Sequence, residues 1–264
     1  MNENHNMERR FSGVRRLYGE QGLAQLHAAH VVVIGIGGVG SWAAEALARN
    51  AVGELTLIDL DNIAESNVNR QIHAVDGNFG KAKVTAMCER ILTINPTCIV
   101  RKIEDFVTTD NIDIILDFNC DVMLDCTDST YAKMALASYC QSKQIPLMMS
   151  GSAGGRVDPT RIKIADLSVA FGDQLLSKVR KQLRQSHDFP KAPDMKKRPL
   201  KKPKKFGVQC VYSDELAATP EAACGSNERS SHTGLHCAGF GSNVTITASM
   251  GFAIAQLALS NLVA

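Results

Sequence analysis

Glycines near the start of the chain have the spacing of a phosphate-binding loop. They follow the pattern GxGxxG and are Gly35, Gly37, Gly38 and Gly40. The β-branched run 30–34 precedes them and the alanine-rich segment 41–49 follows, so the context is strand, tight turn and helix. Small residues let the backbone approach a phosphate closely, and free amides at a helix start carry partial positive charge. The string therefore predicts a nucleotide site, and taken alone it suits a nicotinamide cofactor as well as ATP.

The stretch after the next predicted strand favours ATP over a dinucleotide. Asp59 ends that strand at about the offset expected for an acid that binds a ribose. Two cations and two amides that could reach a triphosphate follow it: Arg70, Lys83, Asn67 and Asn69. Asp128 stands at the end of a later strand, and its carboxylate suits magnesium. A nicotinamide enzyme needs none of these groups, so we expect ATP and magnesium as cofactors.

Alternating strand and helix patterns place these residues in an α/β fold. Apolar runs predict strands at 30–34, 55–59, 99–103, 121–126 and 146–150, and helices at 41–49, 81–94 and 132–142. This order implies a Rossmann-like, mostly parallel, doubly wound sheet. After residue 150 the alternation of apolar residues through 157–164 predicts antiparallel strands that extend the sheet. A chain of 264 residues, 45% of them apolar, is expected to fold as a single domain, 1–264.

Charge is unevenly distributed along the chain. Lys and Arg exceed Asp and Glu by only 29 to 27 overall, but residues 178–205 hold 12 Lys or Arg against two Asp. We expect residues 185–205, which contain four prolines, to form a basic mobile loop. Residues 1–22 are polar and basic and are expected to form an N-terminal arm outside the core. Such asymmetry indicates either a polyanionic partner or a solubilising loop.

The last 27 residues carry no charge, which fits either a buried helix or a membrane span. Residues 238–264 are only moderately apolar and lack flanking basic clusters, so we favour a helix in the core or in a dimer interface. Association with a membrane is the less favoured alternative. The N-terminus has no apolar signal core, and several of the eight cysteines lie in apolar runs, so we expect reduced thiols in a cytoplasmic protein. Because no CxxC pair occurs, no structural zinc is expected.

Several strings together identify a family resemblance. They are GIGGVGSWAAEALAR, DLDN, SNVNRQIH, GKAK, INP and LDCTDS, and the resemblance covers roughly residues 9–170. In this order they resemble the ThiF, MoeB and HesA superfamily, which is related to ubiquitin-activating enzymes. The resemblance implies one adenylating domain that uses ATP to activate a carboxylate as an acyl adenylate and releases pyrophosphate.

The resemblance also implies roles for individual residues. Gly38 would lie under the phosphates, Asp59 would bind the ribose, and Asp128 would act through magnesium. The residues expected to bind ATP are Gly35, Gly37, Gly38, Gly40, Asp59, Asp61, Asn67, Asn69, Arg70, Gln71, Lys83, Asp128 and Ser129. Those expected to act in catalysis are Arg70, Lys83, Asp128 and Arg16. Arg16 is included because members of the superfamily are usually homodimers in which an N-terminal arginine enters the partner's site; Arg10 is the second choice.

Further strings resemble one branch of that superfamily. GSAGGRVDPTRI, LLSKVRKQLR, GVQCVYSDE and HCAGFGSNVTITASMGF are similar to the tRNA threonylcarbamoyladenosine dehydratases. This resemblance implies that ATP activates the threonylcarbamoyl carboxylate on a tRNA adenosine, after which an internal nucleophile closes a ring with net loss of water. A ligase-type or cyclase-type reaction of this kind would form AMP and pyrophosphate.

A tRNA substrate gives the basic loop a role, because lysines near phosphates release counterions on binding. The candidate contacts are Lys196, Lys197, Lys201, Lys202, Lys204 and Lys205. Cys237 is a candidate substrate contact because it lies in a family-like string, although a buried structural thiol is the more frequent role. A metal site formed by His232 and His236 with Cys224 and Cys237 is a minor alternative.

Two other functions stay open. One is an adenylyltransferase that acts on the C-terminal glycine of a sulfur-carrier protein, although such enzymes commonly carry the paired CxxC zinc motifs that this chain lacks. The other is a nucleotide-binding scaffold that recruits a cysteine desulfurase or another sulfur acceptor as its partner.

Overall fold

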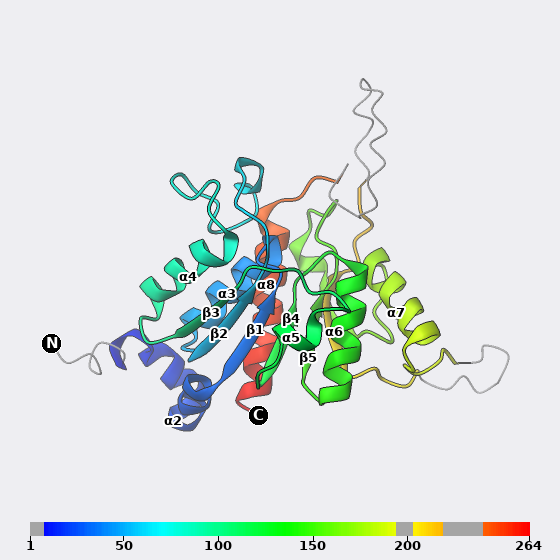
Figure 1. Ribbon diagram of the computed structural model, residues 1–264, viewed down its shortest axis with the longest axis horizontal. Helices are drawn as coiled ribbons and strands as arrows, with labels where there is room; N and C mark the ends of the chain where they lie inside the picture. Colours follow the sequence, from blue (N-terminus) through cyan, green and yellow to red (C-terminus); the bar gives the residue numbers. More distant parts are fainter. Residues whose placement is uncertain (1–7, 194–202, 219–239) are drawn as a thin grey trace, which may run out of the picture.

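A seven-stranded sheet forms the centre of the protein (Figure 1). The computed structural model describes residues 8–193, 203–218 and 240–264. The strand order is β3-β2-β1-β4-β5-β7-β6, and every pairing is parallel except that of β6 with β7. The strands are β1 (His30–Ile34), β2 (Glu54–Ile58), β3 (Ile99–Ile103), β4 (Val122–Asp125), β5 (Leu147–Ser150), β6 (Ile162–Asp166) and β7 (Val208–Ser213). The predicted mostly parallel α/β sheet is thus confirmed, with its antiparallel strand at the β6 edge.

Helices cover both faces of this sheet. They are α2 (Ser12–Ala28), α3 (Gly38–Arg49), α4 (Lys83–Ile94), α5 (Ile112–Ile115), α6 (Thr130–Lys143), α7 (Gln174–Ser186) and α8 (Val244–Leu262), with short 3₁₀ turns η1 (Glu65–Asn67) and η2 (Pro159–Arg161). Side chains of β1 alternate between the faces: Val31 and Val33 pack with α3, α4 and α8, whereas Val32 and Ile34 pack with α6 and α7. All five residues of β1 are buried, as expected for a central strand covered on both sides.

The strand order reverses between β1 and β4 at the centre of the sheet. From β1 the chain builds outward through β2 to β3, and then crosses to β4 on the other side of β1. At such a reversal of strand order, the loops after the two neighbouring strands turn in opposite directions, and ligands of doubly wound folds bind there. The loops that follow β1, β2, β4 and β5 all lie at this carboxyl edge.

Part of the expected N-terminal arm is a packed helix. The helix α2 begins at Ser12, so residues 12–22 are not an arm, although a non-helical Gly19 bends it. Phe11 and Leu26 are buried and Gly22 packs near Val263 at the end of α8. Few apolar residues secure this helix, which is why its polar and basic composition suggested a segment outside the core.

The uncharged C-terminal segment forms α8, which packs in the core as we favoured. Val244–Leu262 is long and apolar enough to cross a membrane, with a mean hydropathy of 1.2, but half of that stretch is buried inside the protein. Met250 and Ile254 lie in the core cluster that also contains α3 and α4. The helix contacts α3 along its length and reaches β4, β5 and β7.

Candidate functional site

The glycine string forms a tight turn between β1 and α3. Gly35 has a positive φ of 84°, and its amide donates to Ile58 O at 2.8 Å. A Cβ on Gly40 would lie only 1.9 Å from Gly35 O, so both positions require glycine for local packing. Gly37 is different, because a Cβ there would meet no atom within 4 Å. The turn therefore leaves open space at Gly37, beside the first amides of α3, where a phosphate could approach.

Asp59 supports this turn from the end of β2. Its two carboxylate oxygens accept the amides of Ile36 at 2.7 Å and Asp61 at 2.9 Å. Only 7% of Asp59 is exposed, and burial raises the pKa of its carboxyl, an effect that nearby Lys83 opposes. Asp59 therefore fixes the glycine turn directly, and its remaining lone pairs are the ones a ribose hydroxyl would use.

Lys83 reaches Asp59 through a short antiparallel bridge. Asn62 pairs with Ala82, and the Lys83 amide donates to Asp61 O at 3.0 Å. The ammonium of Lys83 then lies 2.6 Å from Asp61 Oδ2 and 3.7 Å from Asp59 Oδ1, with 8% of the side chain exposed. The structure thus brings together the two acids and the lysine that the sequence predicted for the ATP site.

Arg70 is held above the glycine turn by α3 and α8. Its carbonyl accepts hydrogen bonds from Trp42 Nε1 at 3.0 Å and Thr247 Oγ1 at 3.2 Å. Its Nη1 donates to Ser66 O at 2.6 Å, and its Cγ is 3.6 Å from where a Cβ of Gly38 would stand. The guanidinium therefore makes no ion pair within the described residues and keeps its charge available.

Trp42 and Thr247 are site residues that the sequence analysis missed. Thr247 is separated from Arg70 by 177 positions, so no local pattern connects them. A second bond of this kind joins Asn69 Nδ2 to Ser242 O at 2.6 Å. The residues at the start of α8 therefore line the candidate site, whereas their sequence indicated only a core helix.

The amides predicted to bind ATP occupy different environments. Asn67 is buried and its Oδ1 accepts the Ala64 amide at 3.0 Å, which closes the η1 turn. Gln71 is also buried, and its Oε1 has no partner among the described residues. The same is true of both ring nitrogens of His73, whose pKa is lowered to about 4 by burial and then by Lys83 and Arg90. His73 is accordingly a neutral imidazole at pH 7.

A buried ion pair secures the loop after β4. Asp125 Oδ1 lies 3.1 Å from Lys133 Nζ, and neither side chain is exposed at all. The same oxygen accepts the amide and hydroxyl of Thr127 at 3.0 and 2.8 Å. Asp128 follows on the surface, and Ser129 caps α6 by accepting the Ala132 amide at 3.3 Å. Lys133 therefore fixes the segment that presents Asp128, a role that its position in a helix did not suggest.

The described residues contain no group of three or more His, Cys, Asp or Glu side chains that could hold a metal. Magnesium does not need such a group, because it is commonly bound by one or two carboxylates together with waters and substrate phosphates. Exposed Asp128 and Asp61 supply carboxylate oxygens of this kind at the carboxyl edge.

Other predicted residues lie elsewhere. Arg16 is exposed on α2, which precedes the amino end of β1 and lies away from the glycine turn (Figure 1). Arg10 donates to Thr93 O and Ile94 O at 3.2 and 3.0 Å, at the end of α4. Neither arginine enters the site within one chain. Lys204 and Lys205 are exposed before β7. The predicted residues outside the described part are Lys196, Lys197, Lys201, Lys202, Cys224, His232, His236 and Cys237.

Comparison with known proteins is consistent with this geometry. Residues 11–262 match the ThiF family. The chain is 43% identical to tRNA threonylcarbamoyladenosine dehydratase of Haemophilus influenzae, over 94% of this chain and 90% of that protein. A crystal structure of Escherichia coli tRNA N6-threonylcarbamoyladenosine dehydratase, TcdA, in complex with ATP has a TM-score of 0.83 at 40% identity and covers 97% of this chain and 94% of that one; a complex with AMP gives the same values. Molybdopterin-synthase adenylyltransferase of H. influenzae is 32% identical over 59% of this chain and 67% of that protein.

Proposed function

This chain belongs to the ThiF family, and from that premise we propose that it is an ATP-dependent enzyme that dehydrates threonylcarbamoyladenosine in tRNA. The reaction would pass through an acyl adenylate of the threonylcarbamoyl carboxylate, with AMP and pyrophosphate as products. The observation that carries the proposal is the placement of Arg70 and Lys83 beside an open glycine turn supported by Asp59. The dehydratase relatives named above extend over nearly the whole chain, which supports this branch of the family.

Each group of residues in the site would have a role in this reaction. The amides at the start of α3 would hold the phosphates, and Asp59 would accept a ribose hydroxyl. The substrate carboxylate would attack the α-phosphorus of ATP, and Arg70 and Lys83 would stabilise the charge that develops on the departing pyrophosphate. When bound, magnesium would neutralise triphosphate charge, and Asp128 with Asp61 would hold it.

The second half of the reaction needs no nucleophile from the enzyme. A carboxylate oxygen is a poor leaving group, whereas AMP is a good one. A nucleophile within the substrate would attack the acyl carbon, close the ring and release AMP, which carries away the lost oxygen. Holding the two substrate groups close together supplies much of the rate. This accounts for a site built from cations and backbone amides.

Adenylation of a sulfur-carrier tail is the less supported alternative. The molybdopterin-synthase adenylyltransferase matches this chain over a smaller part and at lower identity than the dehydratases do. The absence of CxxC pairs from the sequence points the same way.

We further propose that the protein is a cytoplasmic homodimer. Arg16 is exposed on α2, a helix that lies away from the glycine turn, so it would act only by entering the site of a partner subunit. A cysteine desulfurase or sulfur acceptor would be an additional partner under the scaffold hypothesis.

The proposed reaction can be tested on its product. Incubation of the protein with ATP, magnesium and tRNA that carries threonylcarbamoyladenosine should yield a modified nucleoside lighter by one water. Mass analysis of the digested tRNA measures this change, and omission of ATP is the control. An unchanged nucleoside together with adenylation of a sulfur-carrier tail would replace the proposal with the alternative.

The preference of the site for ATP over NAD can be tested by thermal unfolding of the protein. ATP with magnesium should raise the Tm, because a ligand that binds only the folded state stabilises it, by about 2.7 kcal/mol at 100 times its Kd. NAD should leave the Tm unchanged, since Arg70 and Lys83 suit a triphosphate. Stabilisation by NAD but not by ATP would contradict the assignment of the site.

A further inference from the structure

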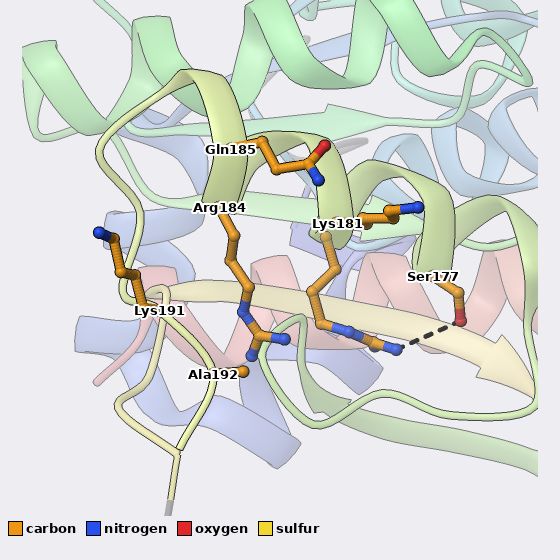
Figure 2. A pocket seen from close by; sticks show the side chains of 7 residues that line it. Ser177, Lys181, Arg184, Gln185, Lys191 and Ala192 are labelled. Atoms are coloured by element: carbon orange, nitrogen blue, oxygen red, sulfur yellow. Dashed lines mark hydrogen bonds between the residues drawn. The ribbon is translucent and has the colours of Figure 1, made fainter. Parts of the chain in front are cut away.

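A second charged feature lies on α7, away from the nucleotide site. An open groove of about 420 Å³ runs between this helix and the segment that follows it (Figure 2). It is lined by Ser177, Arg180, Lys181, Arg184, Gln185, Lys191 and Ala192. The five helical members recur at intervals of one helical turn, so they form one stripe, while Leu176, Val179 and Leu183 bury the opposite face.

No acidic side chain neutralises this stripe within the described residues. The helix Gln174–Ser186 contains no Asp or Glu, and none of the four cations of the groove makes an ion pair. Asp188, the acid in the turn after the helix, is exposed and pairs with none of them. Burial and the neighbouring Arg180 lower the pKa of Arg184, as expected when like charges are close together.

Neutral groups hold the two arginines in place. Arg180 donates to the carbonyls of Leu167 and Ala170 and to Ser177 Oγ. Arg184 donates to Pro190 O at 3.2 Å and lies 5.3 Å from the centre of the Phe206 ring. Carbonyls and a ring fix the guanidinium planes without cancelling their charge. Lys181 and Lys191 are exposed and make no described hydrogen bond, so their ammonium groups are free to contact an anion.

The groove is continuous with the basic segment of the sequence. The rings of Phe189 and Phe206 are buried and lie 5.0 Å apart, so the chain leaves and returns to the core beside the groove. Lys204 and Lys205 are exposed next to Phe206. Two of the lysines that the sequence analysis assigned to tRNA, Lys204 and Lys205, therefore follow the chain directly into this surface.

Resting on the proposed function, we propose that the α7 groove binds the phosphodiester backbone of the tRNA substrate, away from the adenosine that is modified. From Ser177 to Gln185 the stripe runs about 12 Å along the helix axis, which is longer than a single phosphate group. Arginine forks and lysine ammonium groups are the usual partners of nucleic-acid phosphates. Contacts to phosphates position the nucleic acid without reading its sequence, which suits an enzyme that must place one base at a distant site.

The test removes the two free charges of the groove. The double variant K181Q/K191Q should bind tRNA about tenfold more weakly near 0.15 M salt, and the slope of log K against log salt should become shallower by about 1.4 to 1.8. Fluorescence anisotropy with labelled tRNA over a range of salt measures both quantities. With modified tRNA as substrate, KM for tRNA should rise while kcat and the Kd for ATP stay unchanged. Both lysines are exposed, so the Tm should match that of the wild type.

The matched control is Lys178, an exposed lysine of the same helix outside the groove. The single variants K178Q and K181Q are compared for this purpose, and K178Q should bind tRNA more tightly than K181Q does. Equal losses of tRNA affinity in the two single variants would overturn the proposal that the groove binds tRNA and would indicate a diffuse charged face. So would an unchanged affinity and salt slope in the double variant. In each case wild-type dehydration of tRNA would leave the proposed function standing, whereas no product from the wild type would refute that function itself.

Discussion

Replacing Lys83 with alanine should reduce AMP formation by about 100-fold or more. One preorganised charge at a transition state is commonly worth that much, and Lys83 is the cation nearest Asp59 and Asp61. The same loss is expected for Arg70→Ala, whose side chain packs with its Cγ over Gly38. Release of pyrophosphate and AMP under saturating ATP and tRNA measures the effect.

Lys81 offers a matched control two residues away. Its ammonium pairs with Glu89 at 2.7 Å on the surface, so Lys81→Ala removes the same charge from the same loop without touching Asp59. We expect its turnover within a few fold of the wild type, since exposed ion pairs contribute about 0–1 kcal/mol. A Tm for Lys83→Ala close to that of the wild type would show that its loss of turnover is not caused by unfolding. Near-normal turnover of Lys83→Ala would contradict its role.

Lys133→Met should lower the free energy of unfolding by about 3–5 kcal/mol, because it leaves Asp125 as an unpaired charge in the core. At about 2–4 °C per kcal/mol the Tm should fall by roughly 6–20 °C. Thermal and urea unfolding measure this change. The loop that presents Asp128 should loosen as well, since Asp125 also holds Thr127.

A second substitution should restore part of this loss. Asp125→Asn removes the unpaired charge but keeps an oxygen that Thr127 can use, so K133M/D125N should be more stable than K133M alone. Lys143→Met, at the exposed end of the same helix, should change stability by no more than about 0.5 kcal/mol. An unfolding midpoint for K133M equal to that of the wild type would show that the pair contributes nothing to stability.

The parts of the site that could be predicted from sequence are those with local causes. The turn from Gly35 to Gly40 is set by a strand, a steric requirement for glycine and a helix start, all within a few residues. Asp59 follows from its place at the end of a strand. Lys83 could be predicted from its motif, but its contact with Asp59 depends on the bridge between Asn62 and Ala82.

The parts that could not be predicted depend on distant packing. Lysine is almost always exposed, so nothing in the sequence around Lys133 marks it as fully buried. Thr247 looks like an ordinary polar residue in an apolar helix until α8 is placed against Arg70. The α7 stripe is visible as charge in the sequence, but only the structure shows which neutral groups hold Arg180 and Arg184.

The position of α8 has a consequence for the order in which the site is completed during synthesis. Arg70 leaves the ribosome 177 residues before Thr247, which supports its carbonyl, and at 5–20 residues per second this is a delay of roughly 10 to 35 s. During that interval α8 has not yet been synthesised, so the face of α3 that it covers in the folded protein is not yet packed against it. The nascent chain therefore carries the glycine turn and Arg70 before α8 is present to support the Arg70 carbonyl, and this contact forms only when the last helix docks.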